Sequence, residues 1–349
     1  MKWKWIELHS KPWFWGSLAG LFACVICAWW FMQPRVPRLT IYCAHDSVYS
    51  AEVLERFRKE TGIKFDVKYD TEATKSLGLV ELILQEKDAP LCDVFWNNEV
   101  LGTLRLQSAQ MLEPYKSPRY AKVPDQFKDE AGFWTGFGAR LRVYITDPSR
   151  LAATQEAIDQ RLETPDLSEV TIAKPLYGTT LTHYTALWQA WGADAMKAWH
   201  KSISDRGIIE VSGNAVTRAM VAEGVCDLGF TDTDDYFVAK QRRQNVGMLP
   251  VRLPSSEVIC IPNTVCLIRD SDRPKQARKL IDFLLTAKTE VELANSQSRQ
   301  IPLGPVDETT LPEDVRKLMP LTKEALDMSS LREHADACLT WLKGIYTHG

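Results

Sequence analysis

The sequence predicts an α/β protein of two lobes that follows an N-terminal apolar segment. Short apolar strands alternate with amphipathic helices in two successive sets, which is the pattern of parallel sheets covered by helices. A long alternating strand at 139–146 separates the two sets. A run from Pro12 to Met32 contains no Asp, Glu, Lys or Arg, and it precedes both sets.

The composition is that of an ordinary globular protein. The 349 residues include 25% charged residues and carry a net charge of −3. These values exclude a disordered chain, and the absence of a basic excess argues against a nucleic-acid partner. The length is sufficient for two domains that each bury a core.

Residues 1–38 are predicted to be a membrane anchor or a signal segment. The apolar run is about as long as a hydrocarbon core requires, and tryptophans at both ends resemble interfacial belts. Lysines precede the run, which favours an inside N-terminus and an exported remainder. We expect an uncleaved transmembrane helix. Ala23 before Cys24 resembles the cleavage site of a lipoprotein-type signal peptide, but Phe22 departs from that pattern and the apolar run continues to Met32.

The first set of elements starts after this segment. Apolar or alternating strands are expected at 39–44, 63–69 and 93–96. Ser50 is expected to cap a helix that ends at Gly62, and a second helix follows Leu77.

The second set repeats this alternation, and two strands then return to the first set. Strands are expected at 171–173, 208–211 and 227–230, helices at 181–192, 215–223 and 235–243, and the returning strands at 257–261 and 264–268. A bilobed clamshell follows, with 39–137 plus 263–303 as lobe one and 138–262 as lobe two. Residues 304–349 are expected to form packed C-terminal helices.

Polar side chains follow most of the predicted strands. Ligands of open α/β sheets bind beyond the carboxyl ends of the strands. The candidate ligand-binding residues in these loops are His45, Asp46, Glu72, Asn98, Glu99, Gly178, Thr179, Thr180, Asn214, Asp232, Asp234, Asp235 and Tyr236.

Two of these loops have distinct chemistry. Gly178-Thr179-Thr180 precedes a helix, so its N–H groups and hydroxyls are suited to an anion, or it is a plain N-cap. The run from Asp232 to Asp235 offers hard oxygen ligands for a metal or an amine, or it is a solvated helix start.

Enzyme motifs are absent from the sequence. It contains no G-x-S-x-G, no H-E-x-x-H and no G-x-x-x-x-G-K-[ST], so we expect a protein that is not an enzyme and has no catalytic residues. No two cysteines after the apolar run form a C-x-x-C pair. They are expected to be buried thiols, with one disulfide compatible with an oxidising compartment.

Eight segments in chain order resemble the extracellular solute-binding proteins of ABC importers, in particular the ferric-iron-binding group. These segments are TGIKFDVKYDTEATK, DVFWNNE, WTGFGARLRV, PLYGTTLTH, GFTDTDD, IPNTVCLI, LIDFLL and SRQIPL. The resemblance implies a two-lobed clamshell of the type II periplasmic-binding fold, closing on a ligand by hinge motion. It also implies an inner-membrane ABC permease as partner and a periplasmic or extracytoplasmic location, in addition to the membrane contact of the N-terminal helix.

The resemblance also implies a ligand set for Fe³⁺ with a bound anion. His45 and Glu99 stand where the group holds iron, and its tyrosine pair is replaced by Asp234 and Asp235 or reduced to Tyr236. The segment 178–180 and Asn214 resemble the places where the group holds the anion.

Three alternatives remain open at this point. The ligand is an anionic or zwitterionic organic solute such as an aminophosphonate, or the fold carries a secreted enzyme, or it serves a tethered sensor.

Overall fold

The computed structural model describes residues 38–70 and 77–347. The expected transmembrane helix and Glu72 therefore lie outside the described residues. None of the helices that are described is long and apolar enough to cross a membrane.

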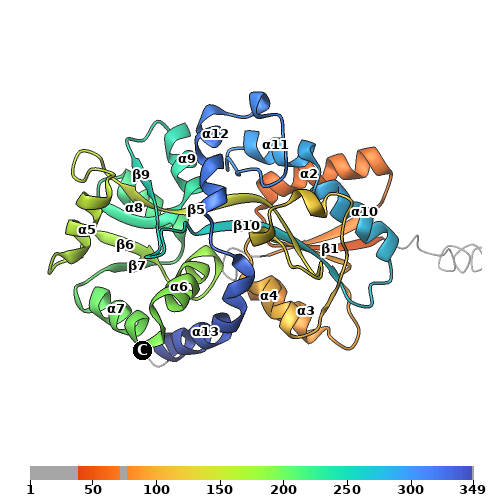
Figure 1. The fold of residues 1–349 in the computed structure, drawn as a ribbon, viewed down its shortest axis with the longest axis horizontal. Coiled ribbons are helices and arrows are strands. Elements are labelled where there is room, and N and C mark those ends of the chain that lie inside the picture. The colour runs from red at the N-terminus through yellow and green to blue at the C-terminus, as the bar shows by residue number, and fades with distance from the viewer. Residues whose placement is uncertain (1–37, 71–76, 348–349) are drawn as a thin grey trace, which may run out of the picture. The chain divides into compact units, whose positions relative to one another are not determined.

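Within these residues, ten strands form one mixed sheet in the order β2-β1-β3-β10-β5-β8-β6-β7, with β4 beside β10 and β9 beside β5 (Figure 1). The strands of the first half are β1 (Leu39–Cys43), β2 (Phe65–Tyr69), β3 (Val94–Asn97) and β4 (Leu112–Glu113). Those of the second half are β6 (Val170–Ala173), β7 (Ile209–Val211), β8 (Leu228–Asp232) and β9 (Gly247–Pro250). The long strands β5 (Thr135–Thr146) and β10 (Cys260–Ile268) join the two halves.

Helices cover each half of the sheet, which gives the two lobes. Lobe one carries α2 (Ser47–Thr61), α3 (Leu77–Gln85), α4 (Leu101–Ser108), α10 (Pro274–Leu284) and α11 (Ala287–Asn295). Lobe two carries α5 (Gln155–Glu163), α6 (Gly178–Trp191), α7 (Ala193–Asp205), α8 (Asn214–Ala222) and α9 (Thr233–Gln241). After both lobes come α12 (Glu313–Leu318) and α13 (Arg332–Thr347). The predicted two-lobed α/β fold is confirmed.

Alternating strand residues account for helices on both faces of lobe one. Ile41 of β1 belongs to the core that includes Phe57 of α2, whereas Tyr42 belongs to the core that includes Ile83 of α3. Because β1 pairs in parallel with β2 and β3, their carboxyl ends meet at one edge of the sheet. In lobe two, β6 pairs in parallel with β7 and β8, so the same holds there.

The crossing strands differ from the prediction of two separate returning strands. One strand, β10, replaces them and begins only at Cys260, and its pairing with β5 shifts between Pro262 and Asn263. Pro262 has no N–H to donate to the sheet, which makes this position suited to a bulge. A bulge bends the strand, and here the bend lies where β10 passes between the two halves. β5 likewise pairs with β10 up to Leu141 and with β8 from Arg142.

Several helices begin earlier than predicted. α2 starts at Ser47 with Asp46 at its N-cap, so Ser50 is inside the helix rather than at its cap. α6 starts at Gly178 and α9 at Thr233, which places the predicted polar loops in the first turns of these helices. These polar residues are weak helix formers and the apolar pattern begins only after them, so periodicity predicts a later start for each helix.

α13 packs against both α6 of lobe two and α4 of lobe one (Figure 1). On the lobe-two side, the Trp341 ring lies 5.5 Å from Trp188 and 5.4 Å from His200. On the lobe-one side, Arg332 pairs with Asp129 at 3.3 Å. The C-terminal helix is therefore a connection between the lobes and not an appendage to one of them.

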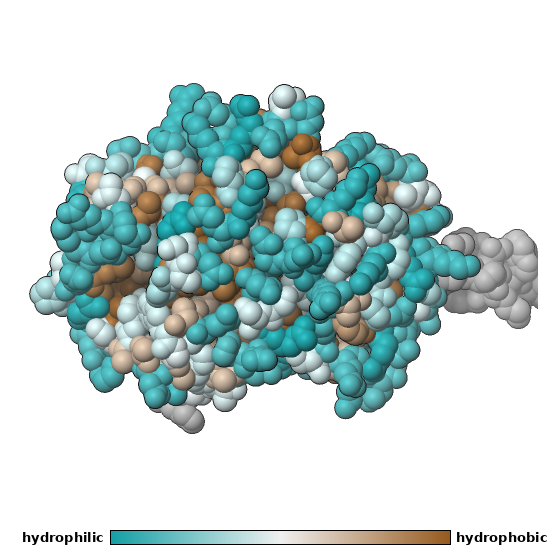
Figure 2. Space-filling model, in the orientation of Figure 1, coloured by the Kyte–Doolittle hydropathy of each residue, from teal (hydrophilic) through white to brown (hydrophobic). Residues whose placement is uncertain are grey.

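The described cysteines are buried thiols, and the visible surface is that of an ordinary globular protein. The six cysteines of the described residues are buried and form no disulfide. The face of the molecule in Figure 2 is largely hydrophilic, with apolar residues scattered among polar ones.

Candidate functional site

The predicted loops converge where the two lobes meet. In lobe one, His45 is 5% exposed and stacks on Trp96 of β3 with 5.5 Å between ring centroids. Tyr49, one helical turn further along α2, lies 5.9 Å from the His45 ring. Asp46 between them is exposed.

Tyr49 lies within electrostatic range of the carboxylates of lobe two. Burial raises the pKa of Tyr49, and Asp234, Asp46 and Asp235 raise it further. The predicted Tyr236 has a different environment, because Asp314 of α12 is the charged group that adds to the effect of burial on its pKa. Tyr49, rather than Tyr236, is therefore the tyrosine whose pKa these carboxylates raise, and the signal for it was the four-residue spacing from His45.

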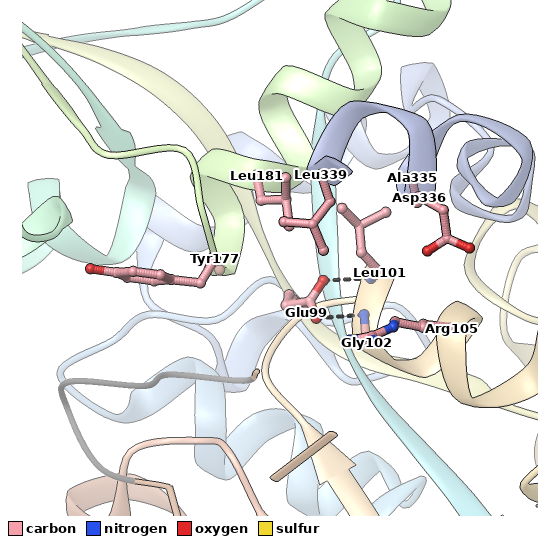
Figure 3. A pocket seen from close by; sticks show the side chains of 10 residues that line it. Glu99, Leu101, Gly102, Arg105, Tyr177, Leu181, Ala335, Asp336 and Leu339 are labelled. Carbon is pink, nitrogen blue, oxygen red and sulfur yellow. Dashed lines mark hydrogen bonds between the residues drawn. The ribbon is translucent and has the colours of Figure 1, made fainter. Parts of the chain in front are cut away.

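Glu99 is used within lobe one as a helix cap. Its carboxylate is 3% exposed and accepts the N–H groups of Leu101 and Gly102, the latter at 2.8 Å (Figure 3). Asn97 donates to it at 3.0 Å, and Thr182 of lobe two donates at 3.4 Å. Burial nevertheless raises the pKa of Glu99, against these hydrogen bonds. Four donors occupy most of the acceptor capacity of one carboxylate. Its role as a ligand stays a prediction.

Asp232 holds the side chains that the sequence suggested for an anion. Its carboxylate is 2% exposed and accepts hydrogen bonds from Thr179 and, at 2.7 Å, from Asn214. Arg142, which is fully buried, pairs with it at 2.9 Å. Thr180 donates to the side-chain oxygen of Asn214 at 3.1 Å. The negative group beside Thr179 and Asn214 is thus the protein's own carboxylate.

Asp234 and Asp235 lie in the first turn of α9. Together with Asp232 they can present one oxygen each within 4.8 Å of one another, which is close enough for the three to hold one cation. Arg218 pairs with Asp235 at 3.4 Å, and Arg140 approaches Asp234 at 3.9 Å. Burial raises the pKa of Asp234, because the opposing effect of Arg140 is smaller and the neighbouring Asp235 and Asp232 also raise it.

Two arginines of β5 complete this cluster. Arg140 and Arg142 lie two residues apart, on the same face of a strand that is almost entirely buried. Arg140 also donates to the backbone oxygen of Asn98 in lobe one. Both residues were missed as site residues, although charged residues two apart in a buried strand were a signal for them.

The lobes are in contact around a small cavity (Figure 3). Its volume is ≈ 20 Å³, space for about one water molecule. Leu101 of α4, Leu181 of α6 and Leu339 of α13 point toward one another across it, so α13 forms a third wall. An organic solute needs the lobes to separate before it can enter.

A larger hollow of ≈ 470 Å³ lies elsewhere, at the amino-terminal side of the lobe-one strands. Thr40, Asp66 and Asp93 line it, at or just before the starts of β1, β2 and β3. It lies away from the predicted loops, which follow the opposite ends of these strands.

Comparison with known proteins assigns the family. A family model for bacterial extracellular solute-binding proteins matches residues 39–291. The chain belongs to this family. The resemblance to ferric-iron-binding members is also confirmed by relatives, including the Fe(3+)-binding periplasmic protein of Serratia marcescens, which is 25% identical over 194 residues. That match covers 55% of each chain, so the protein spans about half the length of this curated relative.

Solved structures show the same fold. Iron-bound HitA from Pseudomonas aeruginosa has a TM-score of 0.74 at 18% identity, and the match covers 88% of this chain and 99% of that one. AfuA from Actinobacillus pleuropneumoniae, with fructose-6-phosphate bound, has a TM-score of 0.70 at 17% identity, over 89% and 98%. Trichodesmium IdiA (FutA) with iron and citrate has a TM-score of 0.67 at 16% identity, over 88% and 98%.

Proposed function

We propose that this protein is the solute-binding component of an ABC-type importer, which captures a small ligand between its lobes and delivers it to a permease in the inner membrane. The family assignment supports binding rather than catalysis. The single observation that carries the site is a contact between the lobes at the carboxylates: Arg140, whose Nε lies 3.9 Å from Asp234, donates to the backbone oxygen of Asn98 in lobe one. Groups from both lobes then close on one ligand, as in hinge-type binding proteins.

The first candidate ligand is ferric iron with a bound anion. The names of the Serratia and Pseudomonas relatives support it, as do the three carboxylates that can meet at 4.8 Å. Carboxylate, phenol and imidazole groups from Asp234, Asp235, Tyr49 and His45 are suited to a hard or borderline cation.

The second candidate is an organic solute with an acidic group, either anionic or zwitterionic. Each of the three carboxylates has an arginine within 4.0 Å, so the cluster is close to neutral before a ligand arrives. A trivalent cation gains less from a compensated cluster than from a bare one. The AfuA structure shows that this fold also accommodates a phosphorylated sugar.

We further propose that residues 1–38 export the domain and anchor it to the cell membrane. The length of the apolar run supports an uncleaved helix. N-terminal sequencing of the membrane-bound protein tests this, because a mature terminus between residues 23 and 38 contradicts the anchor.

Native mass spectrometry of the purified full chain, together with metal analysis, tests the ligand proposal. Ferric iron predicts one iron per chain, lost in Asp234→Asn/Asp235→Asn and kept in the exposed control Asp205→Asn. An organic acid predicts an added organic mass without iron. A protein that carries neither, and that shows no thermal shift with ferric iron, phosphate or glycine, contradicts the proposed function.

A further inference from the structure

We propose that Arg140 receives an anionic oxygen group of the ligand, a carboxylate or a phosphate, and that the side chains of Thr179 and Asn214 do not. This inference rests on the proposed function only in that a ligand binds between the lobes. It moves the anion from the start of α6, where the sequence places it, to the joining strand β5.

The position of Arg140 supports this role. Its side chain is 5% exposed, and it lies on β5 where this strand leaves lobe one. One terminal nitrogen, Nη2, donates to Asn98 of lobe one, and Nε lies 3.9 Å from Asp234 of lobe two. Arg140 is thus placed at the boundary that a ligand between the lobes would touch.

The other terminal nitrogen of Arg140 is unused. Nη1 is buried and finds no hydrogen-bond acceptor among the residues that the structure describes. An enclosed guanidinium N–H without a partner is unfavourable, and an anionic oxygen is its best acceptor. A ligand carboxylate or phosphate that enters with the lobes apart would supply this oxygen as they close.

The alternative donors are already occupied. Thr179 and Asn214 donate to Asp232, whose charge is balanced by Arg142. A second anion at this position would displace a buried carboxylate or face its charge at close range. Nη2 and Nε of Arg142 also have no partner within the described part of the chain, but this residue is 0% exposed behind Asp232.

The anionic group has two sources that the experiment distinguishes. It belongs either to an anion that accompanies a metal ion or to an organic acid that binds alone. Calorimetry with the full chain therefore uses inorganic phosphate and acetate as probes, each in one arm without metal and in a second arm with one equivalent of ferric iron. Uptake only with iron identifies an accompanying anion, and uptake without iron identifies an acid that binds alone.

Three variants test which side chain binds the anionic group. We expect Arg140→Gln to weaken the binding of these probes about tenfold or more, in whichever arm the wild type binds. Arg140→Lys keeps the charge and loses the planar fork, so its affinity should fall between those of wild type and Arg140→Gln. Thr180→Ala tests the other location, the start of α6, where this proposal places no anion, and should change affinity by less than about twofold.

Melting curves of each variant check that it is folded, and Arg140→Lys provides the test if Arg140→Gln does not fold. The inference is overturned if Thr180→Ala loses the probes while the Arg140 variants keep them, or if the wild type binds neither probe in either arm. Iron that binds without any anion also overturns it and leaves the proposed function standing. Failure of the proposed function has a different result, because then no ligand of any kind is found.

Discussion

The two lobes use buried carboxylates at equivalent places for different tasks. In lobe one, Glu99 follows β3 and is satisfied mainly by the first turn of its own helix α4. In lobe two, Asp232 ends β8 and is satisfied by side chains from β5, α6 and α8. The carboxylate of lobe one therefore holds a local turn, whereas that of lobe two joins elements that are distant in sequence.

Among the variants that test this comparison, Asp232→Ala is expected to change the free energy of unfolding most. It leaves the fully buried Arg142 without its counter-charge and Thr179 and Asn214 without their acceptor. Breaking a buried ion pair by removing one partner costs about 3–5 kcal/mol. Urea denaturation should show a loss of this size in the free energy of unfolding. Asp205→Asn on the surface should change it by less than about 0.5 kcal/mol, and an equally small change in Asp232→Ala would contradict the network.

Glu99→Gln should have a smaller effect. The amide nitrogen would face an N–H group of Leu101 or Gly102 and leave one buried donor unsatisfied, at about 1–3 kcal/mol. If Glu99 is only a cap, ferric iron should bind to this variant within about twofold of wild type. A loss of more than about tenfold in calorimetry would place Glu99 in the ligand set after all.

Asp234→Asn tests a carboxylate that has few donors. The folded state raises the pKa of Asp234 above its ordinary value of 3.8. The stability that protonated Asp234 contributes is therefore fully present below pH 3.8, and it is lost as the pH rises toward the raised pKa of the folded state. The variant lacks this loss. We expect its free energy of unfolding, relative to wild type, to increase with pH, by chemical denaturation at several pH values. A difference that falls with pH would show that Arg140 stabilises the ionised form.

The smallest effect is expected from Arg332→Ala, which removes a partly exposed ion pair between α13 and lobe one. Such a pair contributes about 1 kcal/mol or less. The free energy of unfolding should barely change, but small-angle scattering of the ligand-free protein should show a larger radius if this pair helps to hold the lobes together. Lys201→Ala, which removes an exposed pair within α7, is the control and should leave the radius unchanged.

The fold was accessible from the sequence because hydrophobic periodicity determines it. The alternation at 39–69 places Ile41 and Tyr42 on opposite faces, and the structure buries them in different cores. Periodicity alone did not predict the single strand β10, because its passage between the two halves depends on Pro262 and on pairing with β3, β4 and β5.

The candidate site was predicted only in part. Loops after parallel strands converge within each lobe by topology, so the sequence could group His45 with Glu99 in lobe one and Thr179 with Asp232 in lobe two. The pairing of Asp232 with Thr179, Asn214 and Arg142 depends on side-chain geometry across four elements, which no local pattern encodes. Polar loops after strands do not indicate Tyr49 or Arg140, because Tyr49 lies in a helix and Arg140 in a strand.

The position of α13 has a consequence for how the chain is made. Synthesis runs from the N-terminus, so the ribosome reaches Arg332–Thr347 only after both lobes have been made. Until then Trp188 lacks its partner Trp341, and the walls at Leu101 and Leu181 lack Leu339. A nascent chain that has not yet reached α13 therefore leaves this apolar surface uncovered. Docking of α13 is thus a late step of folding, because it needs surfaces of both lobes to be in place.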